Sequence, residues 1–304
     1  MNYIKVSEAA LRWGLSPRRV RLLCAQNKIE GVIKKGKLYM IPENAQKPVD
    51  GRTIRGKVIA SEVLPLLLKI NALKNELDSK RPLTVGETQR LRDEFMIDFT
   101  YNSNAIEGNT LTLQETAMVL EGMTIDKKPL KDHLEAVGHR DAFLYVEKIA
   151  KDTKITEAVI KDIHSLVLMH RAEDRGVFRR IPVTIMGAYT KPVQPYLIEP
   201  KLTALLTENE TRKKKMHPIE RIARFHLEFE GIHPFIDGNG RCGRLLLNLD
   251  LIQNGYPAIN VKFADRKKYY NAFDEYYKND DATEMINLIG EYVVERLEQY
   301  LELL

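Results

Sequence analysis

The stretch "HPFIDGNGRCGR", His233–Arg244, joins two segments with helical periodicity in this 304-residue sequence. The first, "PIERIARFHLEFEGI", should end as a helix near Gly231, and the second, "RCGRLLLNLDLIQNG", should begin near Gly240 or Arg241. The loop between them therefore leads onto a helix N-terminus, where free backbone N–H groups and the positive end of the helix dipole favour anions. Its glycines let the backbone approach an anion closely, so the stretch predicts a phosphate site.

The side chains of this stretch narrow the chemistry. Arg241 and Arg244 lie three residues apart on the first turn of the second helix, and a guanidinium binds phosphate in a bidentate manner. Asp237 offers a hard oxygen ligand of the kind that Mg²⁺ takes together with phosphate oxygens and water. His233 can accept the proton of a hydroxyl nucleophile near neutral pH. A base, a metal ligand and a phosphate cradle together indicate the transfer of a phosphorus-centred group.

The same stretch reproduces every fixed position of the Fic motif, HxFx(D/E)GNGRxxR. The chain resembles the Fic-domain (Fido) family from about residue 60 to 290. Most members of that family transfer AMP from ATP to a Ser, Thr or Tyr hydroxyl of a target protein. The positions that match the motif are His233, Phe235, Asp237, Gly238, Asn239, Gly240, Arg241 and Arg244.

The resemblance implies a role for each of these residues, with ATP as substrate and Mg²⁺ as cofactor. His233 would be the general base, Asp237 would hold Mg²⁺ between the α- and β-phosphates, and Phe235 would anchor the loop in the core. The remaining positions would bind the nucleotide: the backbone around Gly238 to Gly240 with Asn239 as an anion hole, and Arg241 and Arg244 on the phosphates.

Two further features bear on the nucleotide. Relatives with lysine at the position of Gly240 bind the nucleotide in reverse and act as kinases, whereas glycine accompanies AMP transfer. Tyr269 and Tyr270, in "DRKKYYNAF", match the place where family members pack aromatic residues near the base. Taken alone, each of these tyrosines could equally be an ordinary residue of a helix core or surface.

A non-helical segment interrupts the helical pattern at 176–200. Its apolar residues alternate with others, and the prolines at 182, 192 and 195 forbid a helix, so a short hairpin or a plain connecting loop fits it. The resemblance favours a β-hairpin flap at about 183–195, which would align a target segment by β-augmentation. Its wording "YTKPVQP" departs from the commoner flap sequence. The residues expected to dock the target are Val183, Thr184 and Ile185.

An inhibitory motif is expected at residues 103–109, "SNAIEGN". The spacing of Ser103, Glu107 and Gly108 matches the family pattern (S/T)xxxE(G/N), placed N-terminal to the active loop as in class II members. The resemblance implies that Glu107 pairs with Arg244 and takes the place of the γ-phosphate, so that ATP cannot adopt the reactive pose. The alternative is an ordinary glutamate near a helix cap.

The basic character of the sequence belongs to its N-terminal part. The chain carries a net charge of +5, yet residues 1–57 hold 13 Lys and Arg against 4 Asp and Glu, a net of +9. The remaining residues hold 34 basic and 38 acidic groups, a net of −4. A compact basic part attached to a near-neutral body suggests that this part meets a polyanion.

Residues 6–42 predict two short helices about a tight turn, with Ser16 as N-cap and Pro17 at the first helical position of the second. A β-hairpin around Gly36 should follow. This plan resembles the excisionase or MerR-like winged helix-turn-helix families, which bind DNA. A solvated helix face or a protein-binding module would use the same charges. The candidate DNA contacts are Arg18, Arg19, Arg21, Lys34, Lys35 and Lys37.

These observations predict a mainly α protein in which a winged helix-turn-helix domain, 1–48, is joined by a linker, 49–60, to a Fic-fold helical bundle with a small β-hairpin flap, 61–304. No run approaches the roughly 20 apolar residues that span a bilayer, and "MNYIKVSEAA" lacks a signal-peptide core. The two cysteines, Cys24 and Cys242, have no metal-ligand spacing. We expect a cytoplasmic protein with no membrane partner and no structural zinc.

The function that fits best is an autoinhibited protein adenylyltransferase that modifies a target protein and itself. Two alternatives stay open: a DNA-binding regulator whose Fic domain senses nucleotide, and a deAMPylase that uses the same site. By analogy with the family, the chain can form a homodimer and bind DNA through its N-terminal domain.

Overall fold

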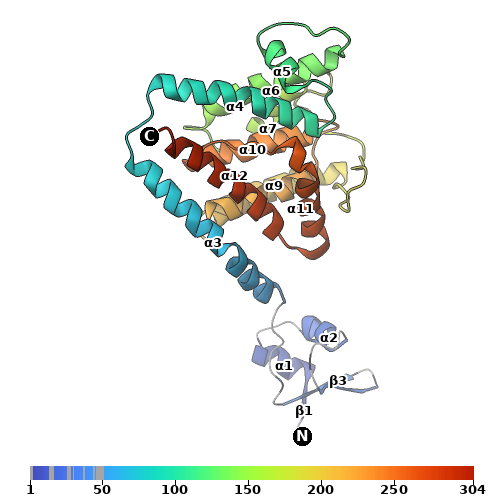
Figure 1. The fold of residues 1–304 in the computed structure, drawn as a ribbon. Coiled ribbons are helices and arrows are strands. Elements are labelled where there is room, and N and C mark those ends of the chain that lie inside the picture. The colour runs from blue at the N-terminus through green and yellow to red at the C-terminus, as the bar shows by residue number, and fades with distance from the viewer. Residues whose placement is uncertain are drawn as a thin grey trace. The chain divides into compact units, whose positions relative to one another are not determined.

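The computed structural model describes residues 3–13, 17–25, 29, 31–36, 38–43, 45 and 51–304, and the side chains at 11, 19, 35 and 51–61 lie outside that description. The chain divides into two compact units, Met1–Val58 and Ile59–Leu304. Figure 1 shows the elements of both units along the chain. None of the helices in the described part of the chain has the length and apolar composition needed to cross a membrane.

The N-terminal unit combines two helices with a three-stranded sheet. The elements are β1 (Tyr3–Lys5), α1 (Val6–Trp13), α2 (Pro17–Ala25), β2 (Ile33–Lys35) and β3 (Leu38–Pro42), and the sheet order is β1-β3-β2 with antiparallel pairing. The two helices and the two hairpin strands lie where the sequence predicts them, and the predicted N-cap Ser16 lies outside the described residues. Strand β1 is an addition, because three residues are too few to show a periodicity. The small core gathers apolar side chains from both helices and β3, among them Trp13, Val20 and Ile41.

The second unit is helical, which confirms the predicted fold class. Helix α3 begins at Gly51, so the part of the predicted linker that is described, 51–60, is helical. The unit also holds 3₁₀ turns at Pro195–Leu197 and Phe263–Asp265. Its α-helices are α3 (Gly51–Ser79), α4 (Val85–Ile106), α5 (Leu113–Leu120), α6 (Leu130–Ile149), α7 (Glu157–Val167), α8 (Ile198–Arg212), α9 (Pro218–Ile232), α10 (Asn239–Gln253), α11 (Arg266–Asn279) and α12 (Thr283–Leu301).

Local sequence signals set several helix starts. Thr84 and Thr112 cap α4 and α5, and each forms a capping box with the glutamate three residues later. Each box satisfies backbone N–H groups that the first helical turn leaves without partners. Helix α4 thereby begins at a defined residue, and its C-terminal end carries the motif that starts at Ser103.

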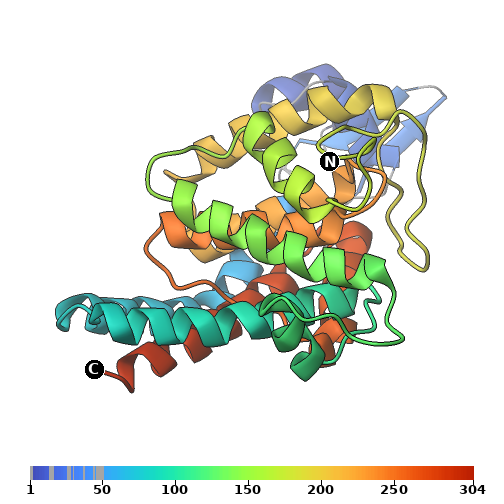
Figure 2. The ribbon, with the colours of Figure 1, turned by 90° about the horizontal axis from the view of Figure 1, so that it is seen from above.

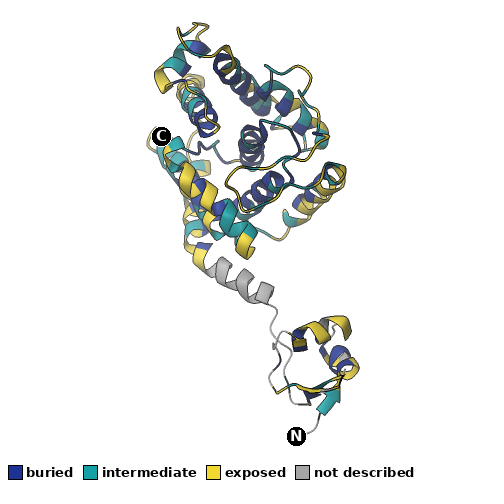
Figure 3. Cartoon of the chain, turned by 90° about the vertical axis from the view of Figure 1, so that its right-hand side faces the viewer, coloured by how far each residue is buried: buried dark blue, intermediate teal, exposed yellow. Residues whose placement is uncertain are grey.

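Helix α10 lies at the centre of the helical unit and packs against α4, α6, α7 and α9 (Figure 1). Nearly all of its residues from Asn239 to Leu251 are buried, including Leu245, Leu246 and Leu249 in one core cluster. The buried elements occupy the interior of this unit and the exposed residues its outer surface (Figure 3). Neighbouring helices surround α10, and its polar side chains Arg244, Asn248 and Asp250 are therefore both buried and hydrogen-bonded. This burial fixes the N-terminus of α10, and with it the predicted active loop, inside the protein.

The predicted flap is a long loop in the structure (Figure 2, yellow). Between residues 176 and 194, all of which the structure describes, there is a turn at Ile185–Ala188, closed by a 3.3 Å bond from the Ala188 N–H to the Ile185 carbonyl, but no strand. The paired strands of the expected hairpin are therefore not formed. Pro182 and Pro192 lack the N–H group that a strand ladder requires, which explains the difference.

Candidate active site

The active loop begins and ends in left-handed backbone conformations. Helix α9 ends at Ile232, and its C-cap His233 has φ 51° while its N–H donates to the Phe229 carbonyl at 3.1 Å. Gly238, with φ 76°, precedes α10. A glycine adopts this conformation without the steric cost that a Cβ would add. Both helix boundaries lie within about two residues of their predicted positions, and the loop reaches the start of α10 as the sequence predicts.

Two buried residues, Phe235 and Asn239, hold the active loop in place. The Asn239 side chain accepts a hydrogen bond from the Phe235 N–H and donates one to the Phe235 carbonyl, both at 2.9 Å. The Phe235 ring is fully buried and stacks on the His164 ring, with 3.6 Å between centroids and 3° between planes. The Asn239 amide is thus engaged with the loop backbone, and Phe235 occupies the core as expected.

His164 is a loop-supporting residue that the sequence did not reveal. Its Nδ1 accepts a bond from the Gly176 N–H at 2.9 Å, and its Nε2 lies 3.0 Å from the Asp237 carbonyl. Burial lowers the pKa of His164 to about 4, so the ring is neutral and Nε2 carries the hydrogen that the carbonyl accepts. A lone histidine on α7 gives no sequence signal for this contact, because its partners lie 12 and 73 residues away.

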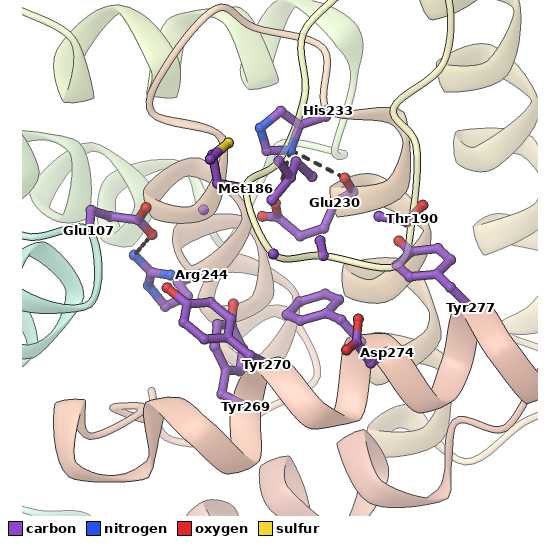
Figure 4. Close-up of a pocket in the computed structure, with 15 residues that line it drawn as sticks. Glu107, Met186, Thr190, Glu230, His233, Arg244, Tyr269, Tyr270, Asp274 and Tyr277 are labelled. Atoms are coloured by element: carbon purple, nitrogen blue, oxygen red, sulfur yellow. Dashed lines mark hydrogen bonds and ion pairs between the residues drawn. The ribbon is translucent and has the colours of Figure 1, made fainter.

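The loop faces a cavity of about 420 Å³ (Figure 4). Glu107 approaches the cavity from the end of α4, the turn 185–188 and Thr190 come from the flap, and α11 supplies aromatic side chains. His233 and Arg244 line the cavity from the loop and from α10. A cavity of this size, lined by aromatic side chains together with charged ones, fits a small-molecule site.

Glu230, near the C-terminal end of α9, contacts the His233 side chain. The His233 Nδ1 lies 3.6 Å from Glu230 Oε2 and 3.3 Å from the Glu230 carbonyl oxygen, as the dashed line in Figure 4 marks. Burial disfavours the Glu230 carboxylate, but the hydrogen bond with His233 and the charge of Arg244 outweigh burial and lower the pKa of Glu230. Glu230 therefore stays ionised beside the base. Sequence reasoning missed it, although its position three residues before His233 on a helical turn was a usable signal.

Arg244 is already occupied. Its Nη2 donates to Glu107 Oε1 at 2.8 Å and to the Ser103 carbonyl at 2.7 Å, while its Nε donates to Ser103 Oγ at 3.0 Å. Burial opposes the charge of this side chain, but the Glu107 carboxylate outweighs burial and raises the pKa of Arg244. A Cβ at Gly240 would lie 2.3 Å from Glu107 Oε1, so the carboxylate rests on a position that only glycine leaves open.

Asp237 and Arg241 form a second charged pair beneath the loop. Arg241 is 1% exposed, and its Nη1 lies 2.9 Å from Glu135 Oε1 while its Nη2 lies 3.5 Å from Asp237 Oδ1. Burial alone would raise the pKa of Asp237, but the charge of Arg241 outweighs burial, so the pKa of Asp237 is lowered. The Asp237 side chain remains 36% exposed, so an ionised carboxylate is accessible to a cation.

This donor set fits Mg²⁺ in one particular way. Within the described residues no group of three or more His, Cys, Asp or Glu side chains is placed to hold a metal ion. Mg²⁺ often binds to one or two carboxylates together with water and substrate phosphates. A single accessible carboxylate at Asp237 agrees with that mode and not with an all-protein metal site.

The two tyrosines differ in their environments. Tyr269 is buried, its hydroxyl lies 2.6 Å from His226 Nε2, and the Arg244 guanidinium carbon lies 5.9 Å from its ring centroid. Tyr270 is 48% exposed and donates its hydroxyl to the Ile106 carbonyl at 3.2 Å. Tyr269 therefore braces Arg244 from the core, and Tyr270 presents its ring to the cavity.

Comparison with known proteins agrees with this geometry. Residues 154–251 match the model of the Fic/DOC family. The chain therefore contains a Fic domain. It is 30% identical over 269 residues to a protein named protein adenylyltransferase Fic from Nematostella vectensis, a match that covers 84% of this chain and 61% of the relative. It is 32% identical over 240 residues to the protein of the same name from Drosophila melanogaster, covering 74% of this chain and 47% of the relative. The chain thus spans less than two thirds of the length of these homologous proteins.

Solved structures place the Fic domain among known folds. A Fic domain-containing signaling protein from Bacteroides thetaiotaomicron is similar at TM-score 0.72 and 27% identity, covering 77% of this chain and 96% of that one. A segment of Fic-1 from C. elegans is similar at TM-score 0.71 and 25% identity, covering 83% of this chain and 76% of that one. The helical unit therefore has the Fic fold.

The cavity of the Fic domain gathers some of the predicted residues and leaves others out. Asp237 and Arg241 lie outside its lining, as do Ser103 and the flap residues Val183 and Thr184. Gly238 and Asn239 likewise belong to the loop support and not to the lining. The predicted residues that do line the cavity are Glu107, Ile185, His233, Gly240, Arg244, Tyr269 and Tyr270.

The candidate DNA contacts are placed only in part. Arg18 and Arg21 are exposed on α2, and Lys34 is exposed on β2 with its ammonium 5.6 Å from the Tyr39 ring centroid. Lys37 and the side chains of Arg19 and Lys35 lie outside the described residues.

Proposed function

We propose that the Fic domain of this chain is an autoinhibited protein adenylyltransferase, which moves AMP from ATP to a hydroxyl group of a target protein and of the chain itself. The homology to proteins named for this activity supports the reaction. The observation that carries the autoinhibition is the 2.8 Å contact of Arg244 with Glu107 in the cavity that holds His233. The base and a phosphate-binding arginine share one cavity, and a carboxylate already occupies the arginine.

In the transfer step, the target hydroxyl oxygen forms a bond with the α-phosphorus of ATP. The bond from that phosphorus to the oxygen bridging to the β-phosphate breaks, and pyrophosphate leaves. His233 takes the hydroxyl proton: Glu230 holds Nδ1, which leaves Nε2 for the proton. When bound, Mg²⁺ neutralises charge on the phosphates, and Asp237 is the residue that would hold it.

Glu107 inhibits this step by competing for Arg244. A carboxylate at 2.8 Å from the guanidinium takes the donors that the distal phosphates of ATP would need, and it adds negative charge where phosphate charge must enter. The Arg244 side chain is only 2% exposed, so water screens its attraction to Glu107 poorly. Release requires Glu107 to leave Gly240 and expose Arg244.

The flap is the proposed docking site for the target chain. Its turn carries Ile185 and Met186, which both line the cavity, and Met186 is also 92% exposed. Val183 and Thr184 precede the turn in a stretch whose backbone groups have no strand partner, so an extended target segment can pair with them. Exposed apolar side chains beside a reactive cavity favour contact with a protein.

The direct test is mass spectrometry of purified Glu107→Gly protein after incubation with ATP and Mg²⁺. The proposal predicts AMP on a Ser, Thr or Tyr residue of the chain or of a protein in an added lysate. The double variant Glu107→Gly, His233→Ala should carry none, because the base is gone. AMP on that double variant at the same level would remove His233 from its proposed role.

We propose a separate nucleic-acid function for the N-terminal unit. Its net charge of +9 over residues 1–57 and the exposure of Arg18, Arg21 and Lys34 support binding to DNA. A gel-shift experiment with duplex DNA from upstream of the gene tests this. Arg18→Ala, Arg21→Ala protein should lose binding, and affinity should fall steeply with salt. Equal binding by the double variant would argue against the proposed contacts.

A further inference from the structure

Arg179, in the loop that leads into the flap, is a buried cation whose side-chain partners are all main-chain carbonyls. The side chain is 5% exposed, and burial lowers the pKa of Arg179 with no acidic group among the described residues to offset it. A buried charge of this kind is costly unless its donors are satisfied. The carbonyl contacts satisfy these donors, and they indicate what the side chain does.

The guanidinium joins two segments that are distant in the sequence. In the loop 176–194, which contains the flap, Nη1 donates to the Ile181 carbonyl at 3.0 Å and Nη2 donates to the Val193 carbonyl at 2.5 Å. Arg179 therefore holds the chain on both sides of the turn at 185–188. On the active loop, Nε donates to the His233 carbonyl at 2.8 Å, and Nη2 lies 3.4 Å from the Ile232 carbonyl. The main-chain N–H of Arg179 adds a 3.0 Å bond to the Pro234 carbonyl.

The bond to His233 falls at an unfavourable backbone conformation. His233 is a non-glycine residue in the left-handed region, with φ 51° and ψ 62°. That conformation is unfavourable for a residue with a Cβ. It also turns the chain at the end of α9 and thereby directs the His233 side chain. A donor fixed on the His233 carbonyl holds the peptide that this turn would otherwise leave free.

We propose that Arg179 is a positioning residue that makes the flap and the active loop one unit, so that a target segment aligned on the flap meets the His233 base at a set distance. The coupling of the two segments stands on the contacts alone. Its consequence for AMP transfer rests on the proposed function. Arginine suits this task and lysine does not, because only the planar guanidinium offers five donors in a fixed fork.

Hydrogen exchange tests the coupling without any turnover. The informative amides are those of Tyr189, which donates to Asp274 Oδ1, of His233, and of Phe235, which donates to Asn239 Oδ1. In Arg179→Met protein these amides on both segments should exchange about tenfold faster, while amides of α12 keep their protection. The adjacent Arg180→Met is the matched control, since Arg180 is exposed, and it should leave all of them unchanged.

Arg179→Lys keeps the charge and guards against a variant that fails to fold. It should show the same faster exchange on both segments, since a single ammonium cannot reach the four carbonyls. If a folded Arg179→Met or Arg179→Lys protein keeps wild-type exchange at Tyr189 and His233, the coupling is absent and the proposal is overturned.

Activity supplies the second readout, in a Glu107→Gly background. Arg179→Lys should lower kcat by about 100-fold, as a small misplacement of reacting groups does, with the KM for ATP unchanged. Arg180→Met should match the background. Two results would contradict a positioning role. One is a fall in kcat that is fully explained by a smaller amount of folded protein, and the other is a rise in KM with kcat unchanged. If the Glu107→Gly background itself transfers no AMP, the proposed function fails, and hydrogen exchange still decides the coupling.

Discussion

The Arg244 guanidinium lies 2.8 Å from the Glu107 carboxylate, a pair separated by 137 residues of sequence. Arg244 belongs to the second turn of α10 and Glu107 is the C-cap of α4, so the contact joins the N-terminal part of one helix to the C-terminal end of another at one cavity. The Glu107 carboxylate also rests against Gly240. The loop, the arginine and the proposed inhibitory residue therefore form one connected site.

Gly240→Ala should destabilise the protein through Glu107. The added Cβ would lie 2.3 Å from Glu107 Oε1, the end of a flexible side chain that must shift away from Arg244, and we expect a loss of about 1 kcal/mol in unfolding free energy. In a Glu107→Gly background the same change should be neutral or stabilising by up to about 1 kcal/mol, because alanine favours a helix over glycine. Denaturant unfolding of the four proteins measures this cycle. Equal losses in both backgrounds would show that Glu107 does not occupy this position.

Glu230→Gln should slow AMP transfer without weakening nucleotide binding. The carboxylate lies 3.6 Å from His233 Nδ1 and stabilises the charge that His233 gains on taking a proton. We expect kcat to fall by about 10- to 100-fold with KM unchanged. Glu228→Gln is the matched control on the same helix, where Glu228 pairs with Arg212. Steady-state kinetics in the Glu107→Gly background compares them, and similar rates for both variants would contradict the role of Glu230.

His164 should make stability depend on pH. Its folded pKa of about 4 lies below the ordinary value of 6.5, so the unfolded chain binds more protons between these values. Stability should therefore be complete above pH 6.5 and fall as the pH drops toward 4. His164→Gln should reduce the slope of the unfolding free energy against pH by up to about 1.4 kcal/mol per pH unit. Denaturant unfolding from pH 4.5 to 7 measures it, and an unchanged slope would count against the buried neutral ring.

Asp237→Asn should raise the Mg²⁺ concentration needed for AMP transfer. The change removes the accessible carboxylate beside the loop and keeps its size. We expect the Mg²⁺ requirement to rise by about 10- to 100-fold, with activity partly restored at high Mg²⁺. A magnesium titration of labelling activity measures the effect, with Asp78→Asn as the control because Asp78 is an exposed carboxylate paired with Lys74. An unchanged Mg²⁺ dependence would remove Asp237 as the metal ligand.

The sequence predicts the helical fold and the centre of the site because both depend on short patterns. Helical periodicity on either side of His233–Arg244 locates the loop to within about two residues. The motif that contains Glu107 indicates its contact with Arg244 across the chain, and the structure contains that contact. Resemblance supplied this second inference, since a single glutamate near a helix cap has no distinctive pattern.

The remaining features depend on contacts that no local pattern records. Arg179 meets carbonyl groups 14 and 54 residues away, and main-chain acceptors leave no trace in a sequence. The flap was expected as a paired hairpin, yet Pro182 and Pro192 remove donors that pairing would need. Alternation of apolar residues was outweighed there by proline.

The most direct test of the account is the rate of AMP transfer from α-labelled ATP with Mg²⁺, measured for wild type, Glu107→Gly and Glu121→Gly. Glu121 is a matched control, because it is also a helix C-cap followed by a glycine, at the end of α5. We expect Glu107→Gly protein to label itself or a target about tenfold or more faster than wild type, and Glu121→Gly protein to label at the wild-type rate. Equal labelling by wild type and Glu107→Gly would contradict the account.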